Sequence, residues 1–471
     1  MKSTYVILAA GLGTRMNSSL PKVLHPVYGV PMIQSIVSTV KRLAPGKIIV
    51  IAGRHVDGMK KVLNDRDIVY ARQKVQKGTG HALRSARKEL RHCKGTVVVL
   101  NGDTPLITAK TIREFLLRHH KNRNFVSVLS FRAQNPDSYG RILRDSSRNV
   151  LAVIEERDAT LRQKKIREVN SGIYALHPGA LGFLDEIKMN KKKKEYYLTD
   201  IVDIALRRGK RTAAYCIGHE REFLGVNTKQ ELLQATRFMK ERIINHWIAR
   251  GVYFIDEDSV YIHPDAVLGA ETTLYPNVFI DKQSIIGKRV TIYPNVRILS
   301  SAIGNDVIIK DMTVIEGSVI KNKALIGPFA HIRPDSEIGS EARIGNFVEL
   351  KKTVIGKKTN AAHLSYLGDA VIGRHVNIGA GTITCNYDGK SKHVTTIGDY
   401  AFVGSDSQLI APITVGKGAY IGAGSTISKD VPSWALALSR AEQRKILNWA
   451  KKKFQTTGRK KKSKTGRKKE A

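Results

Sequence analysis

The sequence predicts an α/β protein of three parts: a Rossmann-like N-terminal domain, a linker helix and a left-handed parallel β-helix of hexapeptide repeats. Three observations support this prediction. Apolar strands alternate with helical patterns from Tyr5 to about Asn227, the stretch from Lys229 to Gly251 has no internal glycine or proline, and aliphatic residues then recur every six positions. These patterns divide the chain into residues 1–227, 228–250 and 251–450, with a tail at 451–471.

The first part begins with a buried strand at Tyr5–Leu8, which a loop separates from apolar residues at helical spacing between Pro31 and Leu43. Further apolar runs, KIIVIAG, TVVVLNGD and FVSVLSF, also alternate with helical patterns. This alternation is typical of a mainly parallel sheet covered by helices, in which ligands bind outside the carboxyl ends of the strands. We therefore expect a binding site where the first strand ends.

The six-residue period fits neither an α-helix nor a simple strand. Hexads taken three at a time describe a triangular parallel β-helix, in which each hexad supplies one short strand and successive coils stack their aliphatic residues. The repeated positions are Ile262, Leu268, Leu274, Ile280, Ile286, Ile292, Ile298, Ile303, Ile309, Ile315, Ile320, Ile326, Ile332, Ile338, Ile344, Leu350, Ile355, Ala361, Leu367, Ile372, Ile378, Thr384, Ile397, Val403, Leu409, Val415, Ile421 and Ile427.

The segment CNYDGKSKHVTT (Cys385–Thr396) interrupts the hexads, so we expect it to project as a loop. An insertion that leaves a regular solenoid is a candidate for binding, and a tolerated surface excursion is the alternative.

Composition limits the classes of protein that need consideration. The chain has 471 residues, of which 42% are apolar, so it can bury sizeable cores. It has neither an apolar run long enough to cross a membrane nor the pattern of a signal peptide, and we expect a cytoplasmic protein without integral membrane association. The three cysteines, Cys93, Cys216 and Cys385, are widely separated and indicate neither a disulfide framework nor a zinc site.

The formal net charge of +38 is the feature most typical of a nucleic-acid-binding protein. Part of this charge lies in the tail, where residues Lys451–Ala471 hold eleven lysines and arginines against one glutamate. Its few apolar groups predict a disordered segment. Contact of this tail with a nucleic acid or another anionic surface and a merely solvated terminal run are both open.

The loop LAAGLGTRMNSSLPKVLHP (Leu8–Pro26) lacks the pattern of a P-loop and the third glycine of a dinucleotide fingerprint. It does carry two cations, Arg15 and Lys22, which can neutralise a triphosphate while backbone amides bind one phosphate. Asp103 follows another apolar strand, where a carboxylate is placed to hold Mg²⁺ beside substrate phosphates. A turn-forming aspartate is the alternative.

Eight short motifs occur in a specific order before the hexads: the Leu8–Pro26 loop, QKGTGHA, NGDTPL, YGRI, IEERDAT, VNSGIY, EYYLTD and GVN. Together they resemble a family of bifunctional bacterial enzymes, N-acetylglucosamine-1-phosphate uridylyltransferases fused to glucosamine-1-phosphate acetyltransferases. The resemblance extends from about residue 4 to residue 450. The family makes UDP-N-acetylglucosamine, a precursor of peptidoglycan and lipopolysaccharide.

The resemblance implies an Mg²⁺-dependent transfer of a uridylyl group from UTP to N-acetylglucosamine 1-phosphate, with release of pyrophosphate. It gives Arg15 and Lys22 the role of stabilising the triphosphate, and it makes Asp103 and Asn227 the metal ligands. The family often has an aromatic residue before the glycine and aspartate of NGD, where this chain has Asn101. The implied UTP and UDP-N-acetylglucosamine contacts are Leu8, Ala9, Ala10, Gly11, Lys22, Gln73, Gly78, Thr79, Gly140, Glu155, Asn170 and Asn227.

The hexads place Arg333 and Lys351 at equivalent outward positions on adjacent coils, where like charges repel unless an anion lies between them. One coil later comes His363, which can be neutral near pH 7 and act as a general base. A structural histidine and two hydrated cations are the alternatives that the residues alone leave open.

By the same resemblance, His363 takes the proton from glucosamine 1-phosphate as its amine attacks acetyl-CoA. The implied sugar-phosphate contacts are Arg333, Lys351, Tyr366, Asn377, Asn386 and Tyr387. The implied acetyl-CoA contacts are Ala380, Ser405, Ala423 and Arg440. The family's β-helices resemble those that form homotrimers with acyl-CoA sites between subunits, so we expect a homotrimer. Two alternatives remain at this point: a single-function nucleotidyltransferase with a structural or regulatory β-helix, and a nucleic-acid-binding protein.

Overall fold

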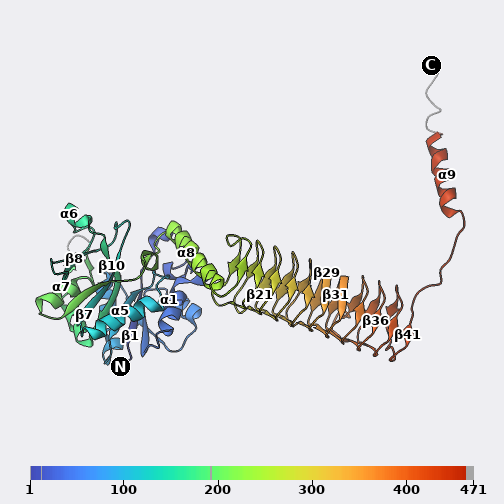
Figure 1. Cartoon of the computed structure of the whole chain (residues 1–471), viewed down its shortest axis with the longest axis horizontal. Helices are drawn as coiled ribbons and strands as arrows, with labels where there is room; N and C mark the ends of the chain where they lie inside the picture. Colours follow the sequence, from blue (N-terminus) through green and yellow to red (C-terminus); the bar gives the residue numbers. More distant parts are fainter. Residues whose placement is uncertain (1, 12, 191–193, 463–471) are drawn as a thin grey trace, which may run out of the picture. The chain divides into compact units, whose positions relative to one another are not determined.

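The computed structural model describes residues 2–11, 13–190 and 194–462, which form two compact units that divide near Ala249 and Arg250 (Figure 1). The first unit contains a sheet of nine strands, and the second contains a long stack of short strands. Each unit is described separately. Within the described residues, no helix is long and apolar enough to cross a membrane.

The N-terminal sheet is mixed but mainly parallel, as the sequence predicts. Its central path runs β13-β7-β10-β6-β1-β4-β5. Here β1 spans Thr4–Ala9 and pairs in parallel with β4 (Lys47–Ala52) and β6 (Val97–Asn101). The exception on this path is β10 (Glu168–Leu176), which lies antiparallel to both β6 and β7 (Val126–Arg132).

Helices cover both faces of this sheet and enclose two hydrophobic cores. On one face, α1 (Met32–Lys41), α2 (Val56–Leu63) and α5 (Ala109–Lys121) bury residues such as Ile36, Met59 and Phe115. On the other, α3 (Thr79–Ser85), α4 (Arg87–Leu90) and α7 (Asp200–Arg207) bury Leu83, Leu90 and Ile201. The remaining strands of the unit are β2 (Pro26–Val27), β3 (Val30–Pro31), β5 (Ile68–Arg72), β8 (Arg141–Arg144), β9 (Val150–Ile154), β11 (Met189–Asn190), β12 (Glu195–Tyr196) and β13 (Thr212–Cys216).

A single helix, α8 (Lys229–Ile248), follows the last motif of the N-terminal unit. Thr228 begins it with a capping box: its hydroxyl accepts from the Glu231 amide, and the Glu231 carboxylate accepts from the Thr228 amide. The expected linker helix is therefore present with bounds close to those the sequence indicates.

The second unit is a parallel β-helix of hexapeptide repeats, visible in Figure 1 as a ladder of stacked coils. Thr273–Leu274 pairs in register with Thr291–Ile292, and that strand pairs with Ile308–Ile309 one coil later. Every repeated aliphatic position, together with Ala361 and Thr384, is buried. The six-residue period therefore identifies the interior of the solenoid correctly.

Two coils depart from the short strands found elsewhere in this unit. The strands β29 (Arg343–Lys351) and β31 (Asn360–Gly368) each extend over nine residues and continue past a corner of the coil. They lie side by side with Asn346 opposite His363 and Glu349 opposite Tyr366. This continuous pairing holds one corner of the solenoid in fixed register.

The interruption of the hexads is a projecting loop, as expected. It connects β34 (Ile383–Cys385) with β35 (Thr395–Ile397), and an antiparallel bridge pairs Tyr387 with Lys392. Its tip is fastened by Asp388, whose carboxylate accepts from the backbone amides of Lys390 and Ser391.

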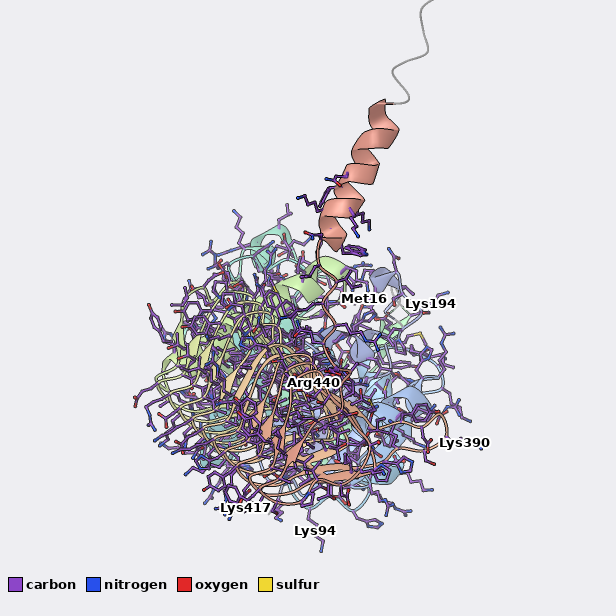
Figure 2. The ribbon with its side chains drawn as sticks, turned by 90° about the vertical axis from the view of Figure 1, so that its right-hand side faces the viewer. Met16, Lys94, Lys194, Lys390, Lys417 and Arg440 are labelled. Carbon is purple, nitrogen blue, oxygen red and sulfur yellow. The ribbon has the colours of Figure 1, made fainter. Side chains whose placement is uncertain are left out.

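The prediction of a disordered tail is wrong for its first part, because α9 spans Trp449–Lys462. Lysine, arginine, alanine and glutamine have high intrinsic helix propensity, so this segment forms a helix without an apolar face to bury. Residues 463–471 lie outside the described residues. Other cations are spread over the surface: Lys94, Lys194, Lys390 and Lys417 all extend outward from the ribbon (Figure 2).

Candidate active sites

The glycine-rich loop after β1 brings Lys22 towards the carboxyl end of the sheet. The loop contains two short 3-10 turns, Thr14–Met16 and Lys22–Leu24. Gly13 has a φ of 65°, and a Cβ atom there would lie 2.5 Å from Cβ of Lys22. A glycine is therefore required for the two arms of the loop to pack together.

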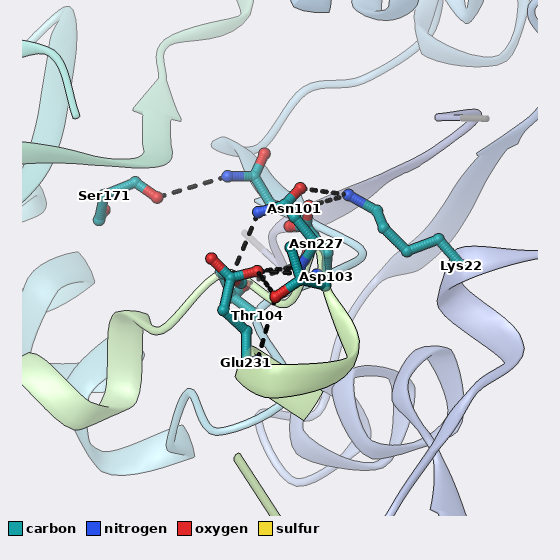
Figure 3. A network of polar contacts seen from close by, with 9 residues as sticks. Lys22, Asn101, Asp103, Thr104, Ser171, Asn227 and Glu231 are labelled. Carbon is teal, nitrogen blue, oxygen red and sulfur yellow. Dashed lines mark hydrogen bonds and ion pairs between the residues drawn. The ribbon is translucent and has the colours of Figure 1, made fainter. Parts of the chain in front are cut away.

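Lys22, Asp103 and Asn227 meet at this end of the sheet (Figure 3). The Nζ atom of Lys22 lies 2.5 Å from Oδ2 of Asp103 and 3.0 Å from Oδ1 of Asn227. One positive group thus lies between a carboxylate oxygen and an amide oxygen, both of which are ligands that Mg²⁺ accepts. The donor set of Asp103 and Asn227 fits a divalent cation.

The start of α8 fixes the backbone that carries Asn227. Glu231 accepts hydrogen bonds from the backbone amides of Asn227 and Thr228, at 2.7 and 2.8 Å. The adjacent Val226 amide donates to the backbone oxygen of Asp103 at 2.9 Å. These contacts hold the two predicted metal ligands next to each other, although they are far apart in sequence.

A pocket of about 400 Å³ opens beside this cluster. Asn101, at the end of β6, lines it where the resembling family often has an aromatic residue; its amide donates to the backbone oxygen of Ser171 at 3.4 Å. The predicted nucleotide contacts among its lining residues are Leu8, Ala9, Ala10, Gly11, Lys22, Gln73, Gly78, Thr79 and Glu155, together with Asp103. Sequence reasoning missed the lining residues Val23, Gln76, Ala82, Glu195 and Tyr197.

Of the predicted sugar contacts, Asn170 lies in β10, Gly140 directly precedes β8 and Glu155 directly follows β9. The Asn170 amide donates to the backbone oxygen of Gly140 at 2.8 Å, and the Thr199 hydroxyl donates to Oε1 of Glu155 at 3.0 Å. Burial, with Glu155 as a second cause, raises the pKa of Asp200 to about 6. Arg15 is exposed in the first 3-10 turn and, like Gly140, Asn170 and Asn227, is not among the lining residues of the pocket.

In the β-helix, several predicted residues follow one corner of successive coils. Asn346 lies opposite His363. Backbone hydrogen bonds join the coils that follow: the amides of Gly381, Asp406 and Gly424 donate to the oxygens of Leu364, Ala380 and Ser405, respectively. His363, Ala380, Ser405 and Ala423 therefore form one edge, and Arg440 joins it by donating to the backbone oxygen of Ala423 at 3.0 Å.

At the start of this edge, His363 is exposed and its Nδ1 lies 3.2 Å from Oδ1 of Asn346. An amide oxygen can only accept, so Nδ1 carries the proton and Nε2 keeps its lone pair. The imidazole is thereby held in the tautomer that can accept a proton through Nε2. Sequence reasoning missed Asn346, although it precedes His363 by one coil.

A group of cations lies at the other end of the strand pair that carries this histidine. Arg333 and Lys351 are on adjacent coils, as predicted, since Ile332 pairs with Leu350. Arg333 also contacts Glu349 at 2.8 Å, so its charge is partly balanced within the chain. The ammonium of Lys392 in the projecting loop, followed by burial and Arg333, lowers the pKa of Lys351.

Tyr366 and Asn386 come together above Gly368. A Cβ atom on Gly368 would lie 2.5 Å from the Tyr366 hydroxyl and 2.9 Å from Nδ2 of Asn386. Asn386 also donates to the Asp369 carboxylate. Asn377 lies on the neighbouring strand β33 (Asn377–Ile378), and Tyr387 is exposed in the loop. Five of the six predicted sugar-phosphate residues thus belong to paired strands or the loop beside them, with Arg333 directly after β27 (His331–Ile332).

Comparison with known proteins agrees with this two-part organisation. Residues 5–170 match the MobA-like NTP transferase domain, residues 256–336 match the GMPPB C-terminal domain, and residues 395–429 match the bacterial transferase hexapeptide repeats. The chain is 48% identical to the bifunctional protein GlmU of Thermodesulfovibrio yellowstonii over 95% of its own length and 99% of that protein. It is 45% identical to GlmU of Bacillus subtilis over 93% of its length and 96% of that protein.

The chain belongs to the bifunctional GlmU family.

Membership of the GlmU family makes the chain an enzyme, a transferase with a nucleotidyltransferase domain and a hexapeptide-repeat acetyltransferase domain. The resemblance stated from the sequence motifs and the predicted fold class are both confirmed. Of the alternatives, the single-function nucleotidyltransferase and the nucleic-acid-binding protein are disfavoured by a match to GlmU that covers both domains.

Proposed function

We propose that the N-terminal pocket transfers a uridylyl group from UTP to N-acetylglucosamine 1-phosphate, and that the β-helix edge transfers an acetyl group from acetyl-CoA to glucosamine 1-phosphate. The observation that supports the first reaction most strongly is the convergence of Lys22, Asp103 and Asn227 beside a nucleotide-sized pocket. For the second it is His363, oriented by Asn346 on the paired strands β29 and β31, together with Lys351 at the end of β29 beside Lys392 of the loop.

In the first reaction, a phosphate oxygen of the sugar attacks the α-phosphorus of UTP while the bond to the β-phosphate oxygen breaks. Lys22 would turn from its two oxygen partners towards the phosphates and stabilise the pyrophosphate that leaves. Arg15 would approach the triphosphate from the exposed 3-10 turn. Gly140, Glu155 and Asn170 would orient the sugar, and Gln73, Gly78 and Thr79 would bind the base.

Mg²⁺ is the proposed cofactor of this reaction, with Asp103 and Asn227 as its protein ligands. When bound, it would supply positive charge that offsets the negative charge developing on the leaving pyrophosphate. The chain contributes two oxygens at hydrogen-bonding distance from the same ammonium group, which is the arrangement a small cation needs.

In the second reaction, Nε2 of His363 would take a proton from the amine of glucosamine 1-phosphate as the nitrogen attacks the thioester carbonyl. The new C–N bond forms as the C–S bond breaks, and the imidazolium returns the proton to the leaving thiolate. Arg333, Lys351, Tyr366, Asn377, Asn386 and Tyr387 would hold the sugar phosphate. Ala380, Ser405, Ala423 and Arg440 would line the path of coenzyme A.

The positive surface supports a preference for these substrates, since UTP, both sugar phosphates and coenzyme A are anions. The same preference is supported near the proposed sugar-phosphate site. The charge of Arg333 is partly balanced by Glu349, whereas the Lys351 and Lys392 ammonium groups repel each other and the pKa of Lys351 is lowered. An anionic phosphate between them would relieve that repulsion. The cytoplasm, where UTP and acetyl-CoA are available, remains the proposed location.

A homotrimer is the proposed assembly, and one face of the β-helix supports it. On that face a column of outward side chains continues through paired strands from Val267 to Val371. Its members are Val267, Ile285, Ala302, Val319, Glu337, Val354 and Val371. The valines and Ile285 are exposed, which favours burial against another copy. Val319→Asp should lower the mass measured by sedimentation velocity, while Leu151→Asp, at an exposed leucine of the N-terminal unit, should leave it unchanged.

The experiment that tests the acetyl transfer omits UTP. Purified protein is mixed with glucosamine 1-phosphate and acetyl-CoA, and release of the free thiol is followed. Thiol release in the wild type that is absent in His363→Ala supports the proposal. No release, from protein that forms pyrophosphate from UTP and N-acetylglucosamine 1-phosphate, would leave the β-helix as a scaffold.

A further inference from the structure

Gln73 lies at the base of the nucleotide pocket with its side-chain amide in one defined orientation. It directly follows β5, is 3% exposed and is anchored by its backbone amide, which donates to the Ala52 oxygen at 2.9 Å. Its Nε2 lies 3.3 Å from the backbone oxygen of Gly78 and 3.0 Å from Nδ1 of His81. Both hydrogens of the amide nitrogen therefore have acceptors.

The two neighbours of Nε2 determine which end of the amide faces them. A backbone oxygen can only accept, and the opposite orientation would put Oε1 of Gln73 against it. The same reversal would put Oε1 against the lone pair of Nδ1. Two acceptor–acceptor contacts would replace two hydrogen bonds, so the nitrogen stays on the side of Gly78 and His81.

His81 can act as this acceptor when its imidazole is neutral, and its surroundings favour that form. Burial, followed by the nearby charges of Lys77 and Arg84, lowers the pKa of His81. The ring is held on the first turn of α3 and stacks on Tyr196 with centroids 6.3 Å apart. A neutral imidazole that accepts through Nδ1 carries its proton on Nε2.

The consequence concerns the other end of the Gln73 amide. Among the described residues, Oε1 makes no hydrogen bond, and Gln73 is one of the residues that line the pocket. The group presented to a base is thus a pure acceptor. Uracil carries an N–H at ring position 3, whereas cytosine carries an unprotonated nitrogen there, which is itself an acceptor.

We propose that His81 is a positioning residue for base selection: by accepting from Nε2 of Gln73 it directs Oε1 into the pocket, where it selects the N–H edge of uracil over cytosine. This inference rests on the proposed uridylyl transfer and deepens it. His81 itself does not contact the base. Its effect is carried entirely by the orientation of one amide.

The test compares two substitutions of equal size at position 81. The Oδ1 atom of asparagine occupies nearly the place of histidine Nδ1, so His81→Asn keeps an acceptor, whereas His81→Leu removes it. UTP and CTP are titrated separately into each full-length protein with Mg²⁺, and the two dissociation constants are measured by calorimetry. His92→Leu, at an exposed histidine of the same unit, is the control.

We expect the wild type to bind UTP more tightly than CTP, and His81→Leu to reduce that preference roughly ten-fold, the effect of about one hydrogen bond. His81→Asn should retain most of the preference, and His92→Leu all of it. If His81→Leu does not fold, His81→Ala removes the same acceptor. Equal weakening of UTP and CTP in the Leu or Ala variant, or the same loss of preference in His81→Asn, would overturn the proposal.

Binding is measured without turnover, so this result and the proposed reaction are judged separately. If His81→Leu loses the preference for UTP but the wild type forms no pyrophosphate with N-acetylglucosamine 1-phosphate, the proposed reaction is contradicted and the role of His81 is supported. A wild type that binds UTP and CTP equally would overturn the role of His81 whatever its activity.

Discussion

The Nζ atom of Lys22 lies 2.5 Å from Oδ2 of Asp103, so the chain neutralises this carboxylate with its own ammonium group. The same ammonium contacts Asn227, the second proposed ligand of Mg²⁺. Lys22 and a divalent cation therefore compete for the same two oxygens. In the proposed reaction Lys22 would bind phosphate oxygens of the nucleotide instead, which would end the competition.

Removing this ammonium should increase the affinity of the nucleotide-free protein for a divalent metal. For Lys22→Met we expect Mn²⁺ to bind more tightly, by roughly an order of magnitude, because a charged competitor is gone. The rate of uridylyl transfer should fall by about 10²–10³-fold, because the group proposed to stabilise the leaving pyrophosphate is absent. Free Mn²⁺ is measured by electron paramagnetic resonance during titration. Lys41→Met, which removes a lysine paired with Asp65, should leave Mn²⁺ binding unchanged; weaker binding in Lys22→Met would contradict the competition.

Substitution of His363 should affect only one of the two proposed reactions. Loss of the proposed general base in His363→Ala should lower acetyl transfer by about 10²–10⁴-fold while uridylyl transfer keeps its rate. His375→Ala provides the matched control, since His375 stacks on Tyr400 in the same unit. Steady-state rates of thiol release and pyrophosphate release report the two activities. Parallel loss of both activities in His363→Ala would show that the division between the domains is incorrect.

Gly368 should be intolerant of even one methyl group. The Cβ of Gly368→Ala would overlap the Tyr366 hydroxyl and the Asn386 amide, so both side chains must move. We expect KM for glucosamine 1-phosphate to rise by roughly ten-fold, since two proposed contacts are displaced together. At Gly182 an added methyl meets open space, and Gly182→Ala is the control. An unchanged KM in Gly368→Ala would argue against a substrate role for Tyr366 and Asn386.

The pKa of Asp200, raised to about 6 by burial and Glu155, predicts a pH-dependent stability. Because the folded state binds this proton more tightly than the unfolded chain, the stabilising contribution is complete below about pH 4 and is lost as pH rises through 6. Asp200→Asn should therefore match the wild type near pH 4 and melt roughly 2–4 °C higher at pH 8. Melting is followed by circular dichroism at both pH values.

Asp203→Asn is the control on the same helix, where the carboxylate is 55% exposed and pairs with Arg207. Its melting temperature should not rise between pH 4 and pH 8 relative to the wild type. A gain in Asp200→Asn that is equal at both pH values would mean that the ionisation of Asp200 is not the cause.

The sequence predicts most reliably those features that repeat. Arg333 and Lys351 could be placed on adjacent coils because each follows a buried aliphatic residue of the same hexad position. The contacts that modify these residues were not predicted. Lys392 reaches Lys351 from a loop of irregular conformation, and Glu349 reaches Arg333 through side-chain geometry that a period does not encode.

In the N-terminal site, too, the motifs predicted the residues but not the contacts between them. Motif order indicated Gln73, Lys22, Asp103 and Asn227, but the contact between Gln73 and His81 depends on a turn between β5 and α3. The antiparallel β10 and the helical start of the tail were also not foreseen. In each case, tertiary packing or intrinsic helix propensity outweighed the pattern used for prediction.

Each of the residues His363, Ala380, Ser405 and Ala423 lies one coil further along the same edge of the β-helix. Adjacent coils differ by one strand spacing, about 4.8 Å, so His363 and Ala423 are separated by roughly 14 Å along the edge. Insertion or removal of one complete coil would move the far end of the edge by one strand spacing and leave the hydrogen bonds between the remaining coils in register. The length of a binding site along this edge can therefore change only by whole coils.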